Sequence, residues 1–133
     1  MQSLLAEMGT SASAQERIVR SVDAAVAGLV QHISLYPVSL EVWAAAARTQ
    51  TRDRFAHAMQ QTYTDYRREI VELVRSAQSA GELKANVDAE SLAMVLVGAV
   101  DGLMLQYWLD PSIDPHRVVR NFFTALFEGI GQP

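Results

Sequence analysis

The residue with the clearest chemical potential is Asp101, a carboxylate in the middle of the apolar stretch from Leu92 to Leu109. A carboxylate in apolar surroundings needs a partner or is neutralised by binding a proton. One interpretation is that it pairs with a cationic ligand while aromatic rings add cation–π contacts, the candidates being Trp43, Trp108, Tyr63 and Tyr66. The other is a hydrogen bond to a neighbouring helix or to a second copy of the chain. The sequence leaves both open.

No other group of residues has the composition or spacing of a reactive site. The chain contains no cysteine, which excludes disulfides, thiol catalysis and thiolate metal sites and favours an intracellular location. His32, His57 and His116 fall in different predicted helices without paired ligand spacing, so no metal is expected. Neither a Ser/His/Asp order, nor a glycine-rich phosphate loop, nor a nucleophile elbow is recognisable. We expect no catalytic residue, no cofactor and no enzymatic activity.

The charge of the chain argues against a nucleic-acid-binding face. The net charge is −4, whereas affinity for phosphate backbone comes from clustered Lys and Arg. Arg48, Arg52 and Arg54 do cluster, but Asp53 lies among them, so we expect a solvated surface there.

The stretch from Leu92 to Leu109 has about the length of a membrane span. Asp101 lies at its centre, however, where a charge costs roughly 3 kcal/mol on the translocon scale, and acidic residues flank both ends. We therefore expect a soluble helix buried on nearly every side, in a cytoplasmic protein without a membrane segment.

The elements that position these residues are predicted to be helices. Apolar residues recur at three- and four-residue spacing between glycines and prolines, and no stretch alternates as a strand would, so the fold class is all-α. A short helical remnant over residues 1–8 precedes five predicted helices, at about 14–34, 39–49, 51–80, 88–109 and 115–129.

Several helix ends have recognisable signals. Pro37 is predicted to end the first long helix, and Ser39 to cap the next one imperfectly. Gly81 has the position of a C′ glycine, Asp88 that of an N-cap, and Asp114 that of an N-cap followed by proline in the first turn.

Large flexible and aromatic side chains on the predicted helices could line a cavity for apolar ligands. The same residue types at helical spacing also form ordinary cores, and that alternative stays open. The candidate ligand-binding residues are Trp43, Met59, Tyr63, Tyr66, Met94, Val97, Asp101, Met104 and Trp108.

The last two helices are apolar on more than one side. A chain of five helices has too little protein to cover them, so we expect a homodimer in which they pack on their twins in a two-fold, four-helix contact. The candidate interface residues are Leu92, Leu96, Ala99, Leu103, Val118, Phe122 and Leu126. Gly98 and Gly102 indicate a close helix contact, space for a bound molecule, or simple packing accommodation.

The run from Tyr66 to Pro111 carries a family pattern. Its features are a long helix ending Gln78-x-x-Gly81-Glu82, the Asp88 cap, and Asp101-Gly102-Leu103 followed by Gln106; Trp43 with Ala44–Arg48 precedes them. In these features the chain resembles the C-terminal half of TetR-family bacterial transcription regulators, most closely the AcrR or betaine-repressor-like type.

That resemblance implies a domain that binds a small molecule between its helices and dimerises through its last two long helices. It also implies an N-terminal helix-turn-helix head that reads operator DNA, and no such head precedes Met1 in this sequence. We expect residues 1–10 to be the end of a connector helix and residues 11–133 to be the ligand-binding and dimerisation domain. The chain is then either a truncated piece of a regulator or a naturally headless relative.

The predicted function is effector sensing for a regulator, expected to be a repressor. An unidentified small-molecule effector would alter DNA binding by the missing head. The alternative is a stand-alone helical dimerisation module without DNA-binding activity.

Overall fold

The computed structural model describes residues 12–50 and 52–132, which form five α-helices and a 3-10 turn. The elements are α2 (Ala14–Gln31), the 3-10 turn (Ile33–Leu35), α3 (Tyr36–Ala47), α4 (Arg52–Ser79), α5 (Ala89–Leu109) and α6 (Pro115–Ile130). The described part has no strand, only an isolated bridge between Leu83 and Gly131. The all-α prediction is confirmed, while the remnant predicted over residues 1–8 lies outside the described residues.

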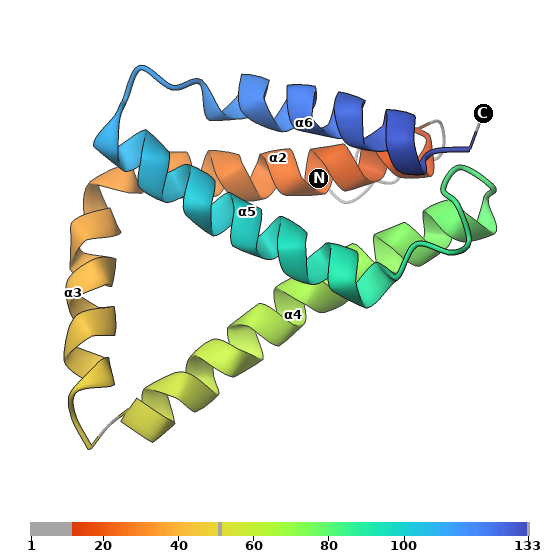
Figure 1. Cartoon of the computed structure of the whole chain (residues 1–133). Helices are drawn as coiled ribbons and strands as arrows, with labels where there is room; N and C mark the ends of the chain where they lie inside the picture. The colour runs from red at the N-terminus through yellow and green to blue at the C-terminus, as the bar shows by residue number, and fades with distance from the viewer. Residues whose placement is uncertain (1–11, 51, 133) are drawn as a thin grey trace, which may run out of the picture.

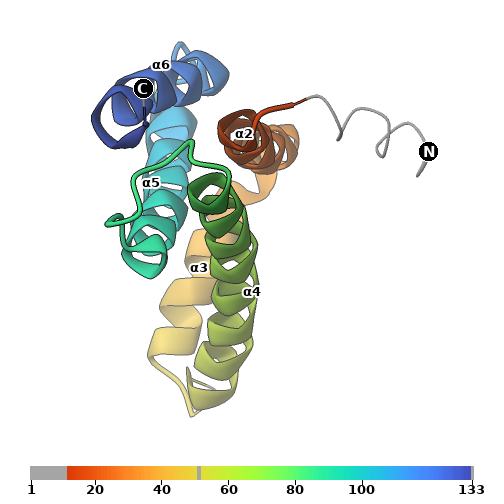
Figure 2. The same cartoon turned by 90° about the vertical axis from the view of Figure 1, so that its right-hand side faces the viewer.

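The helices form an open bundle in which α3 stands apart. Helix α4 packs mainly on α5 and α2, and α2 packs also on α6 (Figure 1). Helix α3 connects the end of α2 to the start of α4 and lies far from α6 (Figure 1). Turned by 90°, the molecule shows α5 and α6 together on one side of the chain (Figure 2).

Local hydrogen bonds fix the helix ends where the sequence signals lie. Helix α2 begins with a capping box between Ser13 and Glu16. Gly81 has a φ of 76° after α4, and the following amide donates to the carbonyl of the last helical turn, as in a Schellman-type end. Asp88 caps α5 and Asp114 caps α6, each accepting from a backbone amide three residues on. These three sequence predictions are confirmed.

The prediction for the junction of α2 and α3 is wrong. Helix α2 ends at Gln31, and Pro37 lies in the first turn of α3 instead of after the preceding helix. Proline is favoured in a first turn because its missing N–H has no intrahelical partner there. Ser39 lies inside α3, where its hydroxyl donates to the carbonyl of Leu35 and does not cap the helix.

The core is a single cluster to which α2, α4, α5 and α6 contribute. Its most deeply buried large side chains include Ile18, Val26, Val74, Met104 and Phe123. Helix α3 buries only one residue, Ala46, so it contributes little to this core.

Helix α5 is covered on one face only, in contrast to the prediction of burial on nearly every side. Its buried residues are Ala89, Ala93, Leu96 and Met104. By length and composition α5 could cross a membrane, and so could α2 with residues 33–47, a pair bent by 63°. That finding is weak, because the core helix of a soluble protein passes the same test. In this chain α5 packs along α4 and carries Asp101 near its centre.

Candidate functional site

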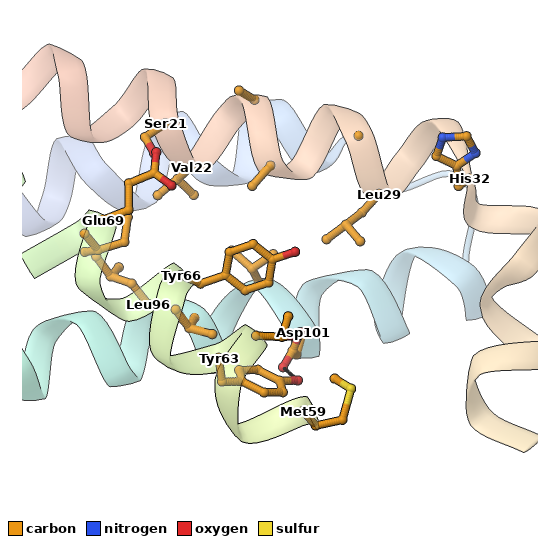
Figure 3. Close-up of a pocket in the computed structure, with 17 residues that line it drawn as sticks. Ser21, Val22, Leu29, His32, Met59, Tyr63, Tyr66, Glu69, Leu96 and Asp101 are labelled. Carbon is orange, nitrogen blue, oxygen red and sulfur yellow. Dashed lines mark hydrogen bonds between the residues drawn. The ribbon is translucent and has the colours of Figure 1, made fainter. Parts of the chain in front are cut away.

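A hollow of about 700 Å³ lies between α2, α4 and α5. Its walls are mostly apolar, with Val22 and Leu29 from α2, Met59 and Ile70 from α4, and Val100 from α5 among them. Figure 3 shows these three helices surrounding the space, with side chains converging from each. Helix α3 contributes no described residue to the lining.

One side-chain hydrogen bond crosses the hollow's wall from α4 to α5. The Tyr63 hydroxyl donates to Asp101 Oδ2 at 2.6 Å (Figure 3). Burial, and then the neighbouring carboxylate, raise the pKa of Tyr63 to about 12. The phenol therefore stays protonated around neutral pH and acts as a donor. Asp101 therefore forms the hydrogen bond to a neighbouring helix that was one of the two interpretations of this residue. This bond does not decide whether Asp101 also pairs with a cationic ligand.

A second carboxylate lies at one end of the hollow. Glu69 Oε1 accepts a hydrogen bond from the Ser21 hydroxyl at 3.0 Å, which links α4 to α2. His32 lies toward the opposite end, beside Leu29 (Figure 3). Among the described residues that line the hollow, none is Lys or Arg. Its fixed charges are therefore negative.

The structure brings together five of the nine candidate ligand-binding residues. Met59, Tyr63 and Tyr66 line the hollow from α4, and Val97 and Asp101 line it from α5. The first three recur at spacings of four and three residues, which places them on one face of a helix.

The other four candidates lie elsewhere. Trp43 packs edge-on against Phe55 with ring centroids 4.9 Å apart and does not line the hollow. Trp108 packs against Tyr36. Met104 is buried in the core, whereas Met94, on the same helix α5, is 58% exposed.

Sequence reasoning missed the wall contributed by α2. Its lining residues are mostly small or polar and recur every three or four positions: Ser21, Val22, Ala24, Ala25, Gly28, Leu29 and His32. Small side chains leave space between helices, so this spacing was a usable signal. The hollow also includes Thr62, Glu69, Ile70, Leu96 and Val100, none of which was a candidate ligand residue.

The candidate dimer residues divide between the core and the surface. Leu96 is buried and also lines the hollow. Three others, Leu92, Leu103 and Leu126, are partly buried and pack against the core. The remaining three are exposed: Ala99 on α5, and Val118 and Phe122 on α6.

A different set of α5 residues faces outward. Met94, Val95, Leu105 and Leu109 are 39–67% exposed. Gly98 and Gly102 lie between them, and an added Cβ at either glycine would meet nothing within 4 Å. At 100° per residue these positions are opposite Ala93 and Leu96 on the helix. We call Met94, Val95, Gly98, Gly102, Leu105 and Leu109, with Val118 and Phe122 of α6, the outer apolar face.

Among the residues that the structure describes, the other polar groups show no arrangement typical of a metal site or a nucleic-acid-binding face. Within the described ranges, no group of three or more His, Asp or Glu side chains is arranged to hold a metal ion. Arg48, Arg52 and Arg54 are exposed at the joint between α3 and α4.

Comparison with known families identifies the class of this domain. The family described as "BetI-type transcriptional repressor, C-terminal" matches residues 14–130. The chain therefore belongs to this family of TetR-type C-terminal domains, and the sequence resemblance is confirmed. It is a family of regulatory, not catalytic, domains. Comparisons with curated proteins and with solved structures gave no match.

Proposed function

We propose that this chain is the ligand-sensing and dimerisation domain of a TetR-type transcriptional regulator, a repressor that binds operator DNA through an N-terminal head outside this sequence. The observation that carries the proposal is the arrangement around α5. One face of this helix lines the hollow, while the opposite face is apolar and open to solvent. This function requires a cytoplasmic location, because the operator DNA of a bacterial regulator is in the cytoplasm.

The hollow has the properties of a small-molecule site. Its volume lies within the usual range for drug-sized ligands, and a few polar groups converge on mostly apolar walls. We assign ligand contacts to Met59, Tyr63, Tyr66, Val97 and Asp101, opposite the small residues of α2.

The outer apolar face has the properties of a protein interface. Monomeric proteins rarely leave large contiguous apolar patches exposed. The patch here includes four large apolar side chains on α5 and two on α6, and the two helices lie together on one side (Figure 2). A second copy related by two-fold symmetry would cover it with the same residues. We therefore propose the outer apolar face as the dimer interface. On α5 it replaces the candidate residues Leu92, Leu96, Ala99 and Leu103.

The loop after α4 provides a path by which a ligand-induced movement of α4 would be transmitted to the start of α2. The amide of Gln15 donates to Glu82 Oε2 at 2.9 Å, and its side-chain amide donates to the Glu82 carbonyl oxygen at 2.7 Å. Helix α4 thus carries the hollow's tyrosines, and the loop that follows this helix holds the start of α2 through Glu82. A ligand that favours one position of α4 would shift the segment that precedes α2. The distance between the two DNA-reading heads of a dimer would then no longer match the distance between the two half-sites of the operator.

Sedimentation velocity over a micromolar concentration series tests the dimer. We expect a dimer that binds no operator DNA, and dissociation in Val95→Glu. The control is Val38→Glu, which places the same charge at another exposed valine, on α3 and outside the outer apolar face; Val38 is 54% exposed and Val95 65%.

A monomer at micromolar concentration, or specific duplex binding by this chain, would contradict the proposal. A dimer that binds no small molecule would favour the stand-alone dimerisation module.

A further inference from the structure

We propose that the hollow binds a bulky lipophilic cation, an organic ion whose positive centre lies beside Asp101 and whose ring-bearing body fills the space between α2 and α4. This inference rests on the proposed ligand-sensing function and names the chemical class of the ligand. It differs from that function in predicting a preference for one sign of charge.

The first argument is the unbalanced charge of the lining. Asp101 and Glu69 both contribute carboxylates, and the described lining residues include no Lys or Arg. Within the described part of the chain neither carboxylate forms a salt bridge; each accepts a hydrogen bond from a neutral hydroxyl, of Tyr63 or of Ser21. The protein therefore solvates these charges without neutralising them. An anionic ligand would be repelled, whereas a cation would supply the missing opposite charge.

The second argument is the accessibility of the Asp101 carboxylate. Its side chain is exposed to the hollow, and only Oδ2 takes part in the bond to Tyr63. A carboxylate can accept several hydrogen bonds or contacts at its two oxygens. Oδ1 therefore remains available to a ligand while Tyr63 holds the side chain in place.

The third argument is the pair of aromatic rings beside this carboxylate. Tyr66 is 55% exposed and extends into the space between α2 and α5 (Figure 3). Neither Tyr63 nor Tyr66 stacks on another ring within the described residues, in contrast to Trp43 and Trp108. Free ring faces next to a carboxylate attract a cation through its charge and its hydrocarbon substituents together.

The size of the hollow determines that the cation is bulky. A volume of about 700 Å³ with apolar walls suits a body of several rings. A compact ion such as tetramethylammonium would leave most of this space unfilled and bury little apolar surface. Binding energy in such a hollow comes largely from that burial.

Isothermal titration of the full chain with three phenyl-bearing probes tests the charge preference; two of them match in shape and differ in the sign of their charge, and the neutral one has one ring fewer. The probes are tetraphenylphosphonium, tetraphenylborate and neutral triphenylphosphine oxide. We expect tetraphenylphosphonium to bind about tenfold more tightly than either of the others, from one carboxylate contact and one cation–π contact in a partly solvated site. Tetramethylammonium should bind more weakly than tetraphenylphosphonium.

Variants separate a ligand contact from a structural role of Asp101. Asp101→Asn should weaken tetraphenylphosphonium binding about tenfold and leave triphenylphosphine oxide unchanged. Asp101→Glu keeps the charge and should restore most of the affinity. Tyr63→Phe keeps the ring and frees the carboxylate, so the cation should bind at least as tightly. Asp65→Asn removes the same charge from an exposed position of α4 outside the hollow and should have no effect.

The outcomes distinguish this inference from the function on which it depends. Equal binding of all three probes, or unchanged cation affinity in a folded Asp101→Asn variant, would overturn the cation preference and leave ligand sensing intact. Failure of every probe to bind would overturn both the preference and the ligand-binding part of the proposed function.

Discussion

Replacing Gly98 by leucine should strengthen the fold of the single chain and weaken its dimer. Gly98 lies within α5, and an added Cβ meets no atom within 4 Å. Glycine inside a helix costs roughly 0.8–1 kcal/mol relative to alanine, and leucine is nearly as good a helix former as alanine. Gly98→Leu should therefore raise the free energy of unfolding of the monomer by roughly 0.5–1 kcal/mol.

The same side chain has the opposite effect on the proposed interface. A glycine on the outer apolar face lets the twin helix approach closely, and a leucine there would occupy the partner's space. Overpacking costs about 1–3 kcal/mol for each site, and two-fold symmetry places the substitution in the contact twice. The total of about 2–6 kcal/mol raises the dissociation constant of the dimer about thirtyfold or more.

Two measurements on the same variant separate these effects. Urea denaturation at a concentration below the dissociation constant gives the stability of the chain, and sedimentation velocity gives the dissociation constant. Gly28→Leu is the matched control, because Gly28 also has open space around its Cβ but lines the hollow on α2. It should gain stability without weakening the dimer. An unchanged dissociation constant in Gly98→Leu would refute the interface proposed here.

Three further predictions concern the core, a helix end and a titration. Phe123→Ala should cost about 3–5 kcal/mol in urea denaturation, because Phe123 is 2% exposed, while Phe122→Ala, at an exposed position, should cost much less. Gly81→Ala should lower the free energy of unfolding by about 1–2 kcal/mol, because the φ of 76° lies in the left-handed region. Tyrosinate absorbance should show one tyrosine titrating near pH 12, and in Asp101→Asn its pKa should fall only part of the way toward 10, because burial is the largest cause of the rise. The pKa of Tyr63 is higher in the folded chain, at about 12, than its ordinary value of 10.0. The free energy of unfolding is therefore unaffected by the ionisation of this tyrosine below pH 10 and decreases as the pH rises toward about 12.

The ends of the helices could be predicted because each depends on a few neighbouring residues. Asp88, Asp114 and Gly81 act through hydrogen bonds and backbone angles within one turn of the chain. Pro37 could not be placed in the same way, because proline is favoured both after one helix and in the first turn of the next. The packing of Tyr36 on Trp108, residues far apart in the sequence, accompanies the start of α3 at Tyr36.

The candidate site could be predicted in part for a similar reason. Met59, Tyr63 and Tyr66 share a face of α4 by spacing alone. The faces of α5 could not be distinguished, since Met94 and Leu96 are equally apolar and only the packing of α4 and α2 decides which is buried. The α2 wall carries mostly small residues, whose three- and four-residue spacing was a usable signal but which have no large or aromatic side chain that marks a ligand contact.

Helix α5 resembles a membrane span because two of its faces are apolar, one toward the core and the hollow and the other toward the proposed twin. One face contributes Leu96 to the core and Val97 to the hollow, and the other carries Gly98 and Gly102, where an added Cβ would meet no atom within 4 Å. With both faces apolar, little of the circumference is left for polar residues, and Asp101 lies beside Gly102 at the boundary between the hollow and the outer apolar face. The thickness of one helix, about 10 Å, separates the proposed ligand from the proposed twin. A ligand that moves α5 must then alter the dimer contact, and by thermodynamic linkage the dimer must alter ligand affinity by the same factor.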